Sequence, residues 1–501
     1  MLRRIKIFLV NGIILTISSL LMHTIGMAFS IYISNKIGSE ALGVFQLIMS
    51  VYMFFITLAT SGINLASTRI VSEELAINNV QGAKKAIKQC VLFSLLVGSS
   101  AGIILFSLSP YIATYWLHGK VSHIIFYILS IALPFMSVSS AINGYFSALR
   151  KVIKTASSQV LEQIIKIFLV IFLFSIFLPN NIEYACLSLV LGSTVSEIIS
   201  CIFAFLLYYF EQRKLEYNYR KKFDYKKRIF RISIPVSITS YVRSGLSTLK
   251  QILIPLQLEK SGLPCDTALS KYGIITGMVM PILMFPSTIL YTFSGLLIPE
   301  FSDYNQKKKY REMNAVITRI FKLIFIFSIF IIGIFWTFSK PLSLLIYNNL
   351  EVAHYLKILA PVAVFIYVDN IIDNLLKGLD KQVGVMLVNV LDLFVSIGFI
   401  LLLLPINGIY AYLTVIYISE LLNFFASLYI LRKTILFKID YYNWIIKPII
   451  GIAFSFFVVY FCNINKKSPL VTLFLEMLIF TVFYFIFLVS SSCIEKKDFR
   501  L

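Results

Sequence analysis

Charged residues are scarce in this chain, and that scarcity is the first constraint on its structural class. Only 14% of the 501 residues are Asp, Glu, Lys or Arg, whereas 58% are hydrophobic. Soluble domains carry about 25% charged and roughly 45–50% apolar residues. The composition therefore excludes a soluble protein and predicts one that lies largely in lipid.

The sequence also lacks the patterns that carry enzyme or metal chemistry. Its four histidines are dispersed, and its six cysteines show no CxxC spacing, so neither a metal site nor a disulfide framework is predicted. Phosphate-binding P-loops, GxGxxG, HExxH and nucleophile signatures are missing as well. We therefore expect a protein that is not an enzyme, with no catalytic residue, metal or cofactor. Coupling to an ion gradient or to the membrane potential is left open.

What the sequence has in abundance is long apolar runs. Runs of about twenty to thirty residues can cross a hydrocarbon core of about 30 Å as helices, which satisfy their own backbone hydrogen bonds. The sequence thus predicts an all-α integral membrane protein with about fourteen transmembrane helices. The predicted spans are 7–34, 42–72, 86–108, 121–149, 155–178, 182–210, 232–257, 268–298, 313–338, 350–377, 383–404, 407–432, 442–462 and 469–492.

The net charge of +21 follows the predicted topology. With the amino terminus inside, most Lys and Arg fall in cytoplasmic loops, as the positive-inside rule requires. This distribution predicts a multi-pass protein of the bacterial inner membrane with both termini cytoplasmic. Membrane lipids with anionic head groups are expected partners, and the protein is expected to be a monomer. Nucleic acid is not an expected partner, because no binding motif accompanies the charge.

The sequence repeats internally. Glu162 and Asp392 lie in matching segments 230 residues apart, and so do Lys151 and Lys381. Spans one to six and seven to twelve are therefore predicted copies with the same orientation, the parallel repeat of some transporters. The predicted divisions are an N-lobe (1–210), a basic cytoplasmic linker (211–231), a C-lobe (232–433), and two accessory spans with a cytoplasmic tail (434–501).

Ionisable residues inside the spans are the main functional candidates. A charged group at a helix centre costs about 2.5–3.5 kcal/mol on insertion scales, so it usually faces protein or a watery cavity. Arg243, Ser247 and Lys250 lie on nearly one face of span seven. They form a polar stripe able to bind an anion such as a pyrophosphate. An ion pair with an acidic residue of a neighbouring span is the alternative.

Spans five and ten carry further candidates. Span five has Gln159 and an i,i+4 pair of opposite charge, Glu162 and Lys166. Span ten has a similar pair, Asp373 and Lys377. Because paired charges are cheaper to bury, a structural role and a role in ligand contact both stay open. Prolines in span eight, Pro281 and Pro286, predict breaks in that helix.

Several ordered motifs resemble one transporter family. They include LATSGI, GYF, SQVLEQ and FPS followed by LLIPE, spread over nearly the whole chain. They are similar to those of the stage V sporulation protein B group of the multidrug/oligosaccharidyl-lipid/polysaccharide exporter superfamily. This resemblance implies two six-helix bundles, two extra helices and alternating access to a central cationic cavity. It implies a flippase that moves a polyprenyl-pyrophosphate-linked oligosaccharide, a cell-wall or peptidoglycan precursor, from the inner to the outer leaflet.

The resemblance also locates the substrate site. Related lipid II flippases place arginines in spans one, two and eight. The span-two position matches Arg69, whereas His23 and Ser30 occupy the span-one positions and Pro281 lies near the span-eight position. The expected lining of the central cavity comprises Arg69, Arg243, Ser247, Lys250, His23, Gln159, Glu162, Lys166 and Asp373.

Two other functions remain as alternatives. A multidrug or cation antiporter of the same superfamily would need an acidic cavity, whereas the clearest charges of span seven are basic. A membrane glycosyltransferase or polymerase would need sizeable outer loops with a catalytic carboxylate or nucleophile, but the predicted outer loops are short.

Overall fold

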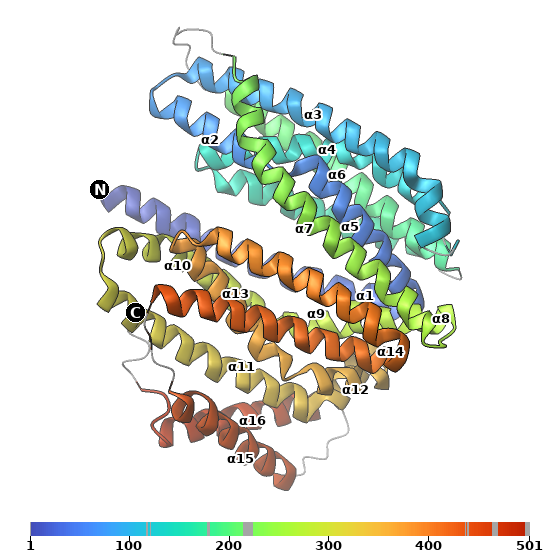
Figure 1. Cartoon of the computed structure of the whole chain (residues 1–501), viewed down its shortest axis with the longest axis vertical. Helices are drawn as coiled ribbons and strands as arrows, with labels where there is room; N and C mark the ends of the chain where they lie inside the picture. Colours follow the sequence, from blue (N-terminus) through green and yellow to red (C-terminus); the bar gives the residue numbers. More distant parts are fainter. Residues whose placement is uncertain are drawn as a thin grey trace. The chain divides into compact units, whose positions relative to one another are not determined.

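The structure is a computed structural model that describes residues 2–116, 119–120, 122–177, 181–213, 224–435, 437, 440–462 and 469–495. Every regular element in these ranges is a helix (Figure 1). The helices are α1 (Leu2–Thr60), α2 (Ile63–Ala76), α3 (Val80–Tyr111), α4 (Ile124–Ala148), α5 (Val152–Phe177), α6 (Ile182–Arg213), α7 (Lys226–Lys260), α8 (Cys265–Gly273), α9 (Met280–Met284), α10 (Ser287–Gln306), α11 (Tyr310–Tyr347), α12 (Leu350–Leu359), α13 (Val362–Gly378), α14 (Gln382–Thr434), α15 (Lys447–Cys462) and α16 (Pro469–Ser490), with π-helical turns at Ile112–Trp116, Ile274–Val279 and Tyr442–Ile446.

Length and hydropathy confirm a membrane protein with many spans. Ten helices in the described residues are long and apolar enough to cross a bilayer. The count is eleven if α12 and α13, which meet at a bend of 57°, form one broken span. The predicted all-helical, multi-pass class is therefore correct. α7, which carries Arg243 and Lys250, is not among these helices.

Two of the helices each contain a sharp kink at a glycine. Gly38 interrupts α1 with φ 78° and ψ 175°, and Gly408 interrupts α14 with φ 55° and ψ −130°. Positive φ costs glycine little, because it has no Cβ. Each kink therefore joins two consecutive apolar segments with almost no loop between them.

The prolines of the predicted eighth span coincide with interruptions, as expected. The π-helical turn Ile274–Val279 follows α8, Pro281 opens α9, and Pro286 immediately precedes α10. Proline lacks an N–H group and its ring clashes with the preceding turn, so a continuous ladder cannot form here. The segment from α8 to α10 is thus an interrupted helix.

The helices divide into two compact units. Unit 1 comprises residues 1–29, 36–256 and 265–270, and unit 2 comprises residues 30–35, 257–264 and 271–501. The predicted linker, 211–231, does not coincide with this division, because most of α7 belongs to unit 1. Residues 214–223 of that linker and residues 496–501 of the predicted tail lie outside the described residues. The lobe boundaries stay a prediction.

Close helix packing through small residues organises unit 1. α4 lies along α3 and also packs against α2 and α6 (Figure 1). A Cβ added to Gly144 would come 2.6 Å from the backbone oxygen of Asn64, and one added to Gly98 would meet Ser137 at 2.7 Å. Ser67 on α2 donates a hydrogen bond of 2.8 Å to the carbonyl of Ala141 on α4. Small residues let backbones approach closely, which is how helices associate in lipid.

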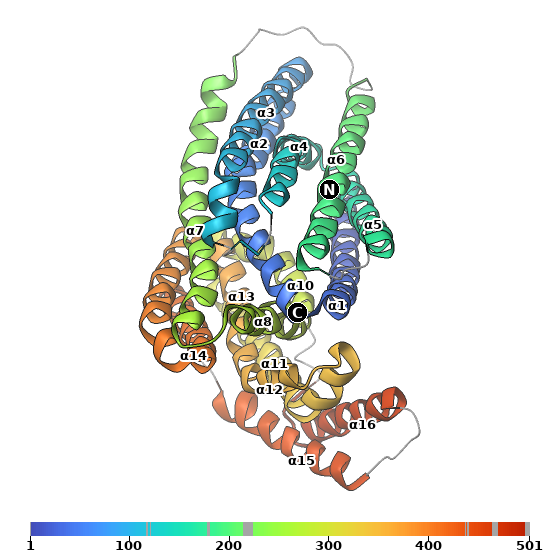
Figure 2. The same ribbon diagram turned by 90° about the vertical axis from the view of Figure 1, so that its right-hand side faces the viewer.

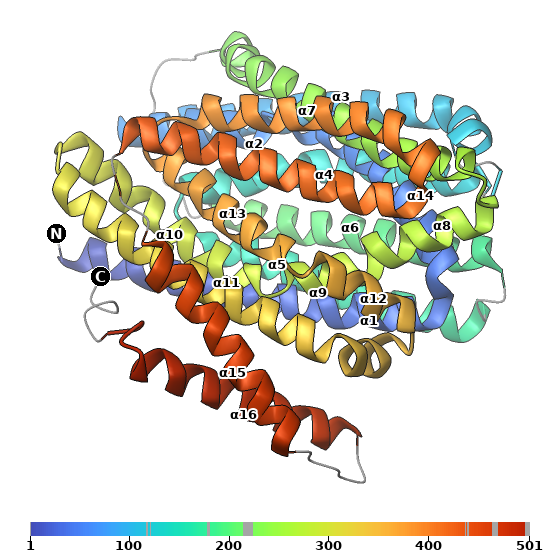
Figure 3. The same ribbon diagram turned by 60° about the horizontal axis from the view of Figure 1, so that its bottom comes forward.

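Unit 2 has a larger apolar core made by α10, α11, α13 and α14. The pair α15 and α16 packs on the α11 side of this core (Figures 2 and 3). There the buried Tyr484 donates a hydrogen bond of 3.1 Å to the backbone oxygen of Ile326. A Cβ on Gly333 would come 2.8 Å from Ile452, so α11 and α15 also approach closely.

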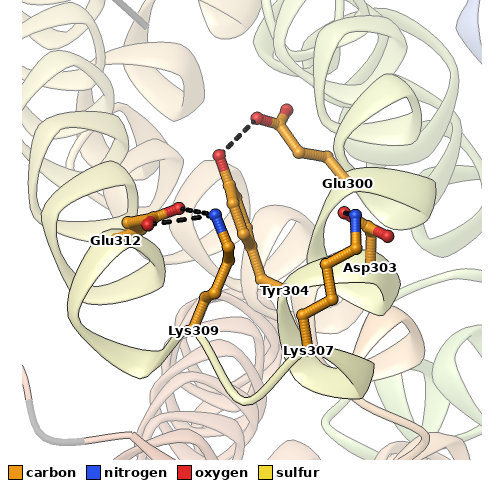
Figure 4. Close-up of polar contacts among 6 residues, drawn as sticks. All are labelled: Glu300, Asp303, Tyr304, Lys307, Lys309 and Glu312. Atoms are coloured by element: carbon orange, nitrogen blue, oxygen red, sulfur yellow. Dashed lines mark hydrogen bonds and ion pairs between the residues drawn. The ribbon is translucent and has the colours of Figure 1, made fainter.

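The turn between α10 and α11 is polar and exposed (Figure 4). Lys307 pairs with Asp303 at 2.7 Å, and Lys309 pairs with Glu312 at 2.9 Å. Tyr304 donates a hydrogen bond of 3.1 Å to Glu300. Exposed pairs of this kind contribute little stability, about 0–1 kcal/mol each. They mark a solvated end of two helices.

Local geometry recurs at the spacing of the sequence repeat. α3 begins at Val80 and α11 at Tyr310, which is 230 residues later. α5 and α14 begin at Val152 and Gln382, again 230 apart. The residues with positive φ that precede these helices are also 230 positions apart. They are Asn78 and Lys308, with φ of 56° and 55°, and Arg150 and Asp380, with φ of 56° and 59°.

Candidate substrate-binding site

Hydrogen bonds fasten the polar face of α7 to α1 within unit 1. Thr248 donates to the backbone oxygen of Ser50 at 2.9 Å, and Tyr241 donates to that of Leu58 at 3.1 Å. Ser237 donates to the backbone oxygen of Ser61, the residue that follows α1, at 2.9 Å. Successive polar residues of α7 therefore act as a ladder along α1. The charged residues between them are held beside that helix.

A cavity of about 470 Å³ lies between these two helices. We call it the arginine cavity. Its polar lining from α7 includes Arg243, Ser244, Ser247 and Gln251, and from α1 it includes Gln46, Ser50 and Thr57. Ligand-binding pockets commonly have volumes of about 300–1,000 Å³ and a few convergent polar groups. The arginine cavity fits that description and carries one permanent positive charge in its lining.

Arg243 is exposed to this cavity. Within the described parts of the chain, no carboxylate lies within ion-pair distance of its guanidinium. The structure therefore gives no support to the alternative of an ion pair between Arg243 and a neighbouring span. Ser247 lies one turn further along and lines the same cavity. A guanidinium with hydroxyl groups nearby can bind an anion through charge-assisted hydrogen bonds.

The other predicted cations lie elsewhere. Lys250 is half-buried, has interactions of its own and is not among the residues that line the arginine cavity. Arg69 on α2 pairs with Glu73 at 3.0 Å, and Glu73 also pairs with Arg228 of α7. Arg69 is thus part of a charge network between α2 and α7. The structure does not bring it into the arginine cavity.

His23 and Gln159 line a second cavity of unit 1, again of about 470 Å³. This cavity lies between the first part of α1 and α5, and we call it the glutamine cavity. Its polar side chains are Ser19, His23, Gln159 and Gln163. The structure thus brings together two predicted site residues that are 136 positions apart in the sequence.

Glu162 and Lys166 belong to a buried polar cluster in the same unit. Lys166 interacts electrostatically with Glu162 and with Glu197 of α6. Tyr52 of α1 has no solvent exposure and donates a hydrogen bond of 2.9 Å to Glu197. The predicted i,i+4 pair therefore has additional partners on two other helices, and it does not line either cavity.

Asp373 lies in unit 2, among other acidic groups. Asp369, one turn earlier on α13, interacts with Asp373 and with Asp392 of α14. Asp392 is buried and accepts hydrogen bonds from Ser419 at 2.6 Å and Ser396 at 3.3 Å. In the described residues no group of three or more His, Cys, Asp or Glu side chains has metal-binding geometry.

Sequence analysis missed the α1 side of the arginine cavity. Gln46, Ser50 and Thr57 are spaced by four and seven residues, so they share one helical face. That spacing was a usable signal, because polar residues on one face of an apolar span usually face protein or water. Tyr52 gave no comparable signal, since a tyrosine in a span is common.

Models of protein families match most of the chain. The model described as "Polysaccharide biosynthesis protein" matches residues 8–305. The model described as "MatE" matches residues 261–402. The first match covers more than half of the chain, including the arginine cavity and the glutamine cavity.

Individual proteins of known name are also similar. Stage V sporulation protein B of Bacillus subtilis (strain 168) is 24% identical over 405 residues, which cover 79% of this chain and 77% of that protein. The lipid II flippase MurJ of the same organism is 23% identical over 409 residues, covering 74% and 72%. A solved structure of lipid II flippase MurJ in an inward closed conformation superposes with a TM-score of 0.72 at 12% identity, covering 95% of this chain and 98% of that one. That likeness shows the fold.

Proposed function

Since the chain belongs to the polysaccharide biosynthesis protein family of the multidrug/oligosaccharidyl-lipid/polysaccharide exporter superfamily, we propose that it is a flippase for polyprenyl-pyrophosphate-linked oligosaccharides. Proteins of this superfamily are transporters and not enzymes. The proposed cargo is a cell-wall precursor, moved from the inner to the outer leaflet of the bacterial inner membrane. Similarity to stage V sporulation protein B and to a lipid II flippase supports this choice.

The arginine cavity is the observation that carries the proposal. Arg243 holds a permanent positive charge on a membrane helix without a carboxylate partner among the described residues. Such a charge is costly unless a water-filled cavity or an anion accompanies it. A pyrophosphate is the anionic part of the proposed cargo, and Arg can bind it with two parallel hydrogen bonds. The polyprenyl tail of the cargo has no need of a polar path and can remain in lipid.

The proposed architecture has fourteen spans. This number is the sum of four contributions. They are the ten apolar helices, the bent pair α12–α13 as one span, one additional span from each of the kinks at Gly38 and Gly408, and α7. The common offset of 230 residues supports two six-span copies with the same orientation. We place α15 and α16 outside the repeat as accessory spans. In such transporters one copy rocks against the other, which gives alternating access to the substrate site.

We test the proposed function with purified protein in lipid vesicles. A polyprenyl pyrophosphate carrying a fluorescent disaccharide is placed in both leaflets, and an impermeant sugar-modifying enzyme is added outside. The protein should make the inner-leaflet fraction accessible much faster than in empty vesicles, and the Arg243→Ala protein should be slower. Equal rates in empty and protein-containing vesicles, under either polarity of membrane potential, would refute the flippase.

A multidrug or cation antiporter is the second candidate. The acidic groups Asp369, Asp373 and Asp392 favour it, and they lie in the part of the chain that matches the MatE model. This function predicts that a proton or sodium gradient drives accumulation of organic cations in the same vesicles. Transport of ethidium without transport of the lipid-linked disaccharide would favour the antiporter over the flippase.

A further inference from the structure

The glutamine cavity poses a physical problem that the proposed pyrophosphate site does not solve. Gln159 and Gln163 lie roughly 10 and 16 Å from the start of α5, at about 1.5 Å per residue, and therefore within the span. Among the described residues neither amide has a hydrogen-bond partner in the protein, and neither has His23. An unpaired amide in an apolar medium costs several kcal/mol. These groups therefore need water or a ligand.

The lining of this cavity defines the chemistry of a ligand. It contains no Asp, Glu, Lys or Arg, in contrast to the arginine cavity. A glutamine amide offers two donors and one acceptor oxygen, and Ser19 adds a hydroxyl group. Met22 and Val160 supply apolar surface beside them. Hydroxyl and acetamido groups on a saccharide ring both donate and accept hydrogen bonds without net charge. They complement this lining, whereas a pyrophosphate does not.

The volume of the glutamine cavity agrees with a saccharide as its ligand. The cavity is about 470 Å³, within the range of about 300–1,000 Å³ for small-molecule sites. Gln159 and Gln163 are one helical turn apart, so their amides can contact neighbouring groups of one ligand. His23 and Ser19, also one turn apart, face them from α1. The polar groups thus come from two helices of the same unit.

We infer that the glutamine cavity binds the saccharide of the lipid-linked substrate, through the amides of Gln159 and Gln163. This inference rests on the proposed function, in which Arg243 binds the pyrophosphate. It divides the head group between two kinds of site, one cationic and one neutral. Gln159 and Gln163 then determine preference for the sugar and have no part in binding the anion.

The test compares two lipids that differ only in the sugar. One is a polyprenyl pyrophosphate, and the other is the same lipid carrying an N-acetylated disaccharide. Binding of each to purified protein is measured for the natural chain, for Gln159→Met/Gln163→Met, and for a matched control, Gln306→Met. Gln306 is exposed at the end of α10, outside both cavities.

We expect the double variant to bind the disaccharide lipid about tenfold more weakly, the loss of one to two neutral hydrogen bonds. Its affinity for the bare pyrophosphate lipid and its thermal stability should not fall, because the amides have no protein partner to lose. Gln306→Met should change nothing. Gln159→Asn/Gln163→Asn, which shortens each side chain by one methylene, provides a second pair of substitutions that keeps the amides.

Other outcomes separate the two proposals. If the natural chain binds both lipids and the double variant leaves their affinity ratio unchanged, the saccharide site is wrong while the flippase stands. If the double variant loses both lipids together with stability, the glutamines are structural and the saccharide site is again wrong. If the natural chain binds neither lipid better than a phospholipid, the proposed function fails, and this inference fails with it.

Discussion

Replacement of Arg243 separates binding of an anion from a structural role. Arg243→Ala removes the positive charge of the arginine cavity, and Arg243→Lys keeps the charge but loses the planar fork. A hydrogen bond to a charged group contributes about 1.5–3 kcal/mol, and 1.4 kcal/mol is a factor of ten in affinity. We therefore expect Arg243→Ala to weaken binding of a polyprenyl pyrophosphate about 10- to 100-fold. Arg243→Lys should weaken it by less.

Stability is the second measurement in this experiment. Arg243 has no carboxylate partner in the described residues, so its removal breaks no ion pair. Removing a charge from a span also lowers the insertion cost, by up to about 2.5–3.5 kcal/mol at a helix centre. Arg243→Ala should therefore accumulate normally and keep its melting temperature in detergent.

The same helix offers a matched control. Arg228 of α7 pairs with Glu73, and it does not line the arginine cavity. Arg228→Ala should leave the affinity for the pyrophosphate lipid unchanged and should lower stability by up to about 1 kcal/mol, because both partners are partly exposed. Unchanged binding by Arg243→Ala would refute our reasoning. So would a loss of folded protein that a second substitution of an acidic residue restores.

Three further outcomes follow from the packing and the charge distribution. Gly144→Ala should destabilise the protein by about 1–3 kcal/mol in thermal unfolding, because the added Cβ would clash with the backbone of α2. Gly398 has open space around it, so Gly398→Ala should be neutral or slightly stabilising. Glu211→Ala should lower thermal stability by about 1–3 kcal/mol, because it removes the buried carboxylate at the end of α6 that pairs with Lys151 and Lys154 at the start of α5; no loss would show that these ion pairs contribute nothing. A single cysteine at Lys309 should resist an impermeant thiol reagent added outside cells while one at His123 reacts, and the reverse pattern would overturn the predicted orientation.

The apolar helices were predictable because each depends on local composition. Apolar length indicated the helices, and a 230-residue offset in short motifs anticipated the matching starts of α5 and α14. The same offset between the starts of α3 and α11 came only from the structure. The continuity of α1 and α14 across their kinks was not predictable. A single glycine with positive φ can replace a whole loop, and sequence does not say which glycine adopts that conformation.

The candidate site was predictable only in part, because each cavity needs two helices. Helical spacing placed Arg243 and Ser247 on one face of α7, and both line the arginine cavity. That α1 forms the opposite wall depends on tertiary packing, which the sequence of α7 does not contain. Arg69 was predicted to line the cavity, although Glu73 four residues later was a usable signal for a salt bridge; the contribution of Arg228 came only from the fold. Lys250 lies on the predicted face, yet the structure does not place it in the cavity lining.

The polar face of α7 has a consequence for biogenesis. A translocon releases a segment into lipid according to its apolarity, and α7 is not among the helices that pass on that criterion alone. Its hydroxyl groups are satisfied by backbone oxygens of α1, at Thr248 and Tyr241 among others. Because α1 is synthesised first, it can serve as an intramembrane acceptor when α7 emerges from the ribosome. A chain that began at α7 would lack that acceptor, so we expect α7 to integrate poorly into the membrane without α1.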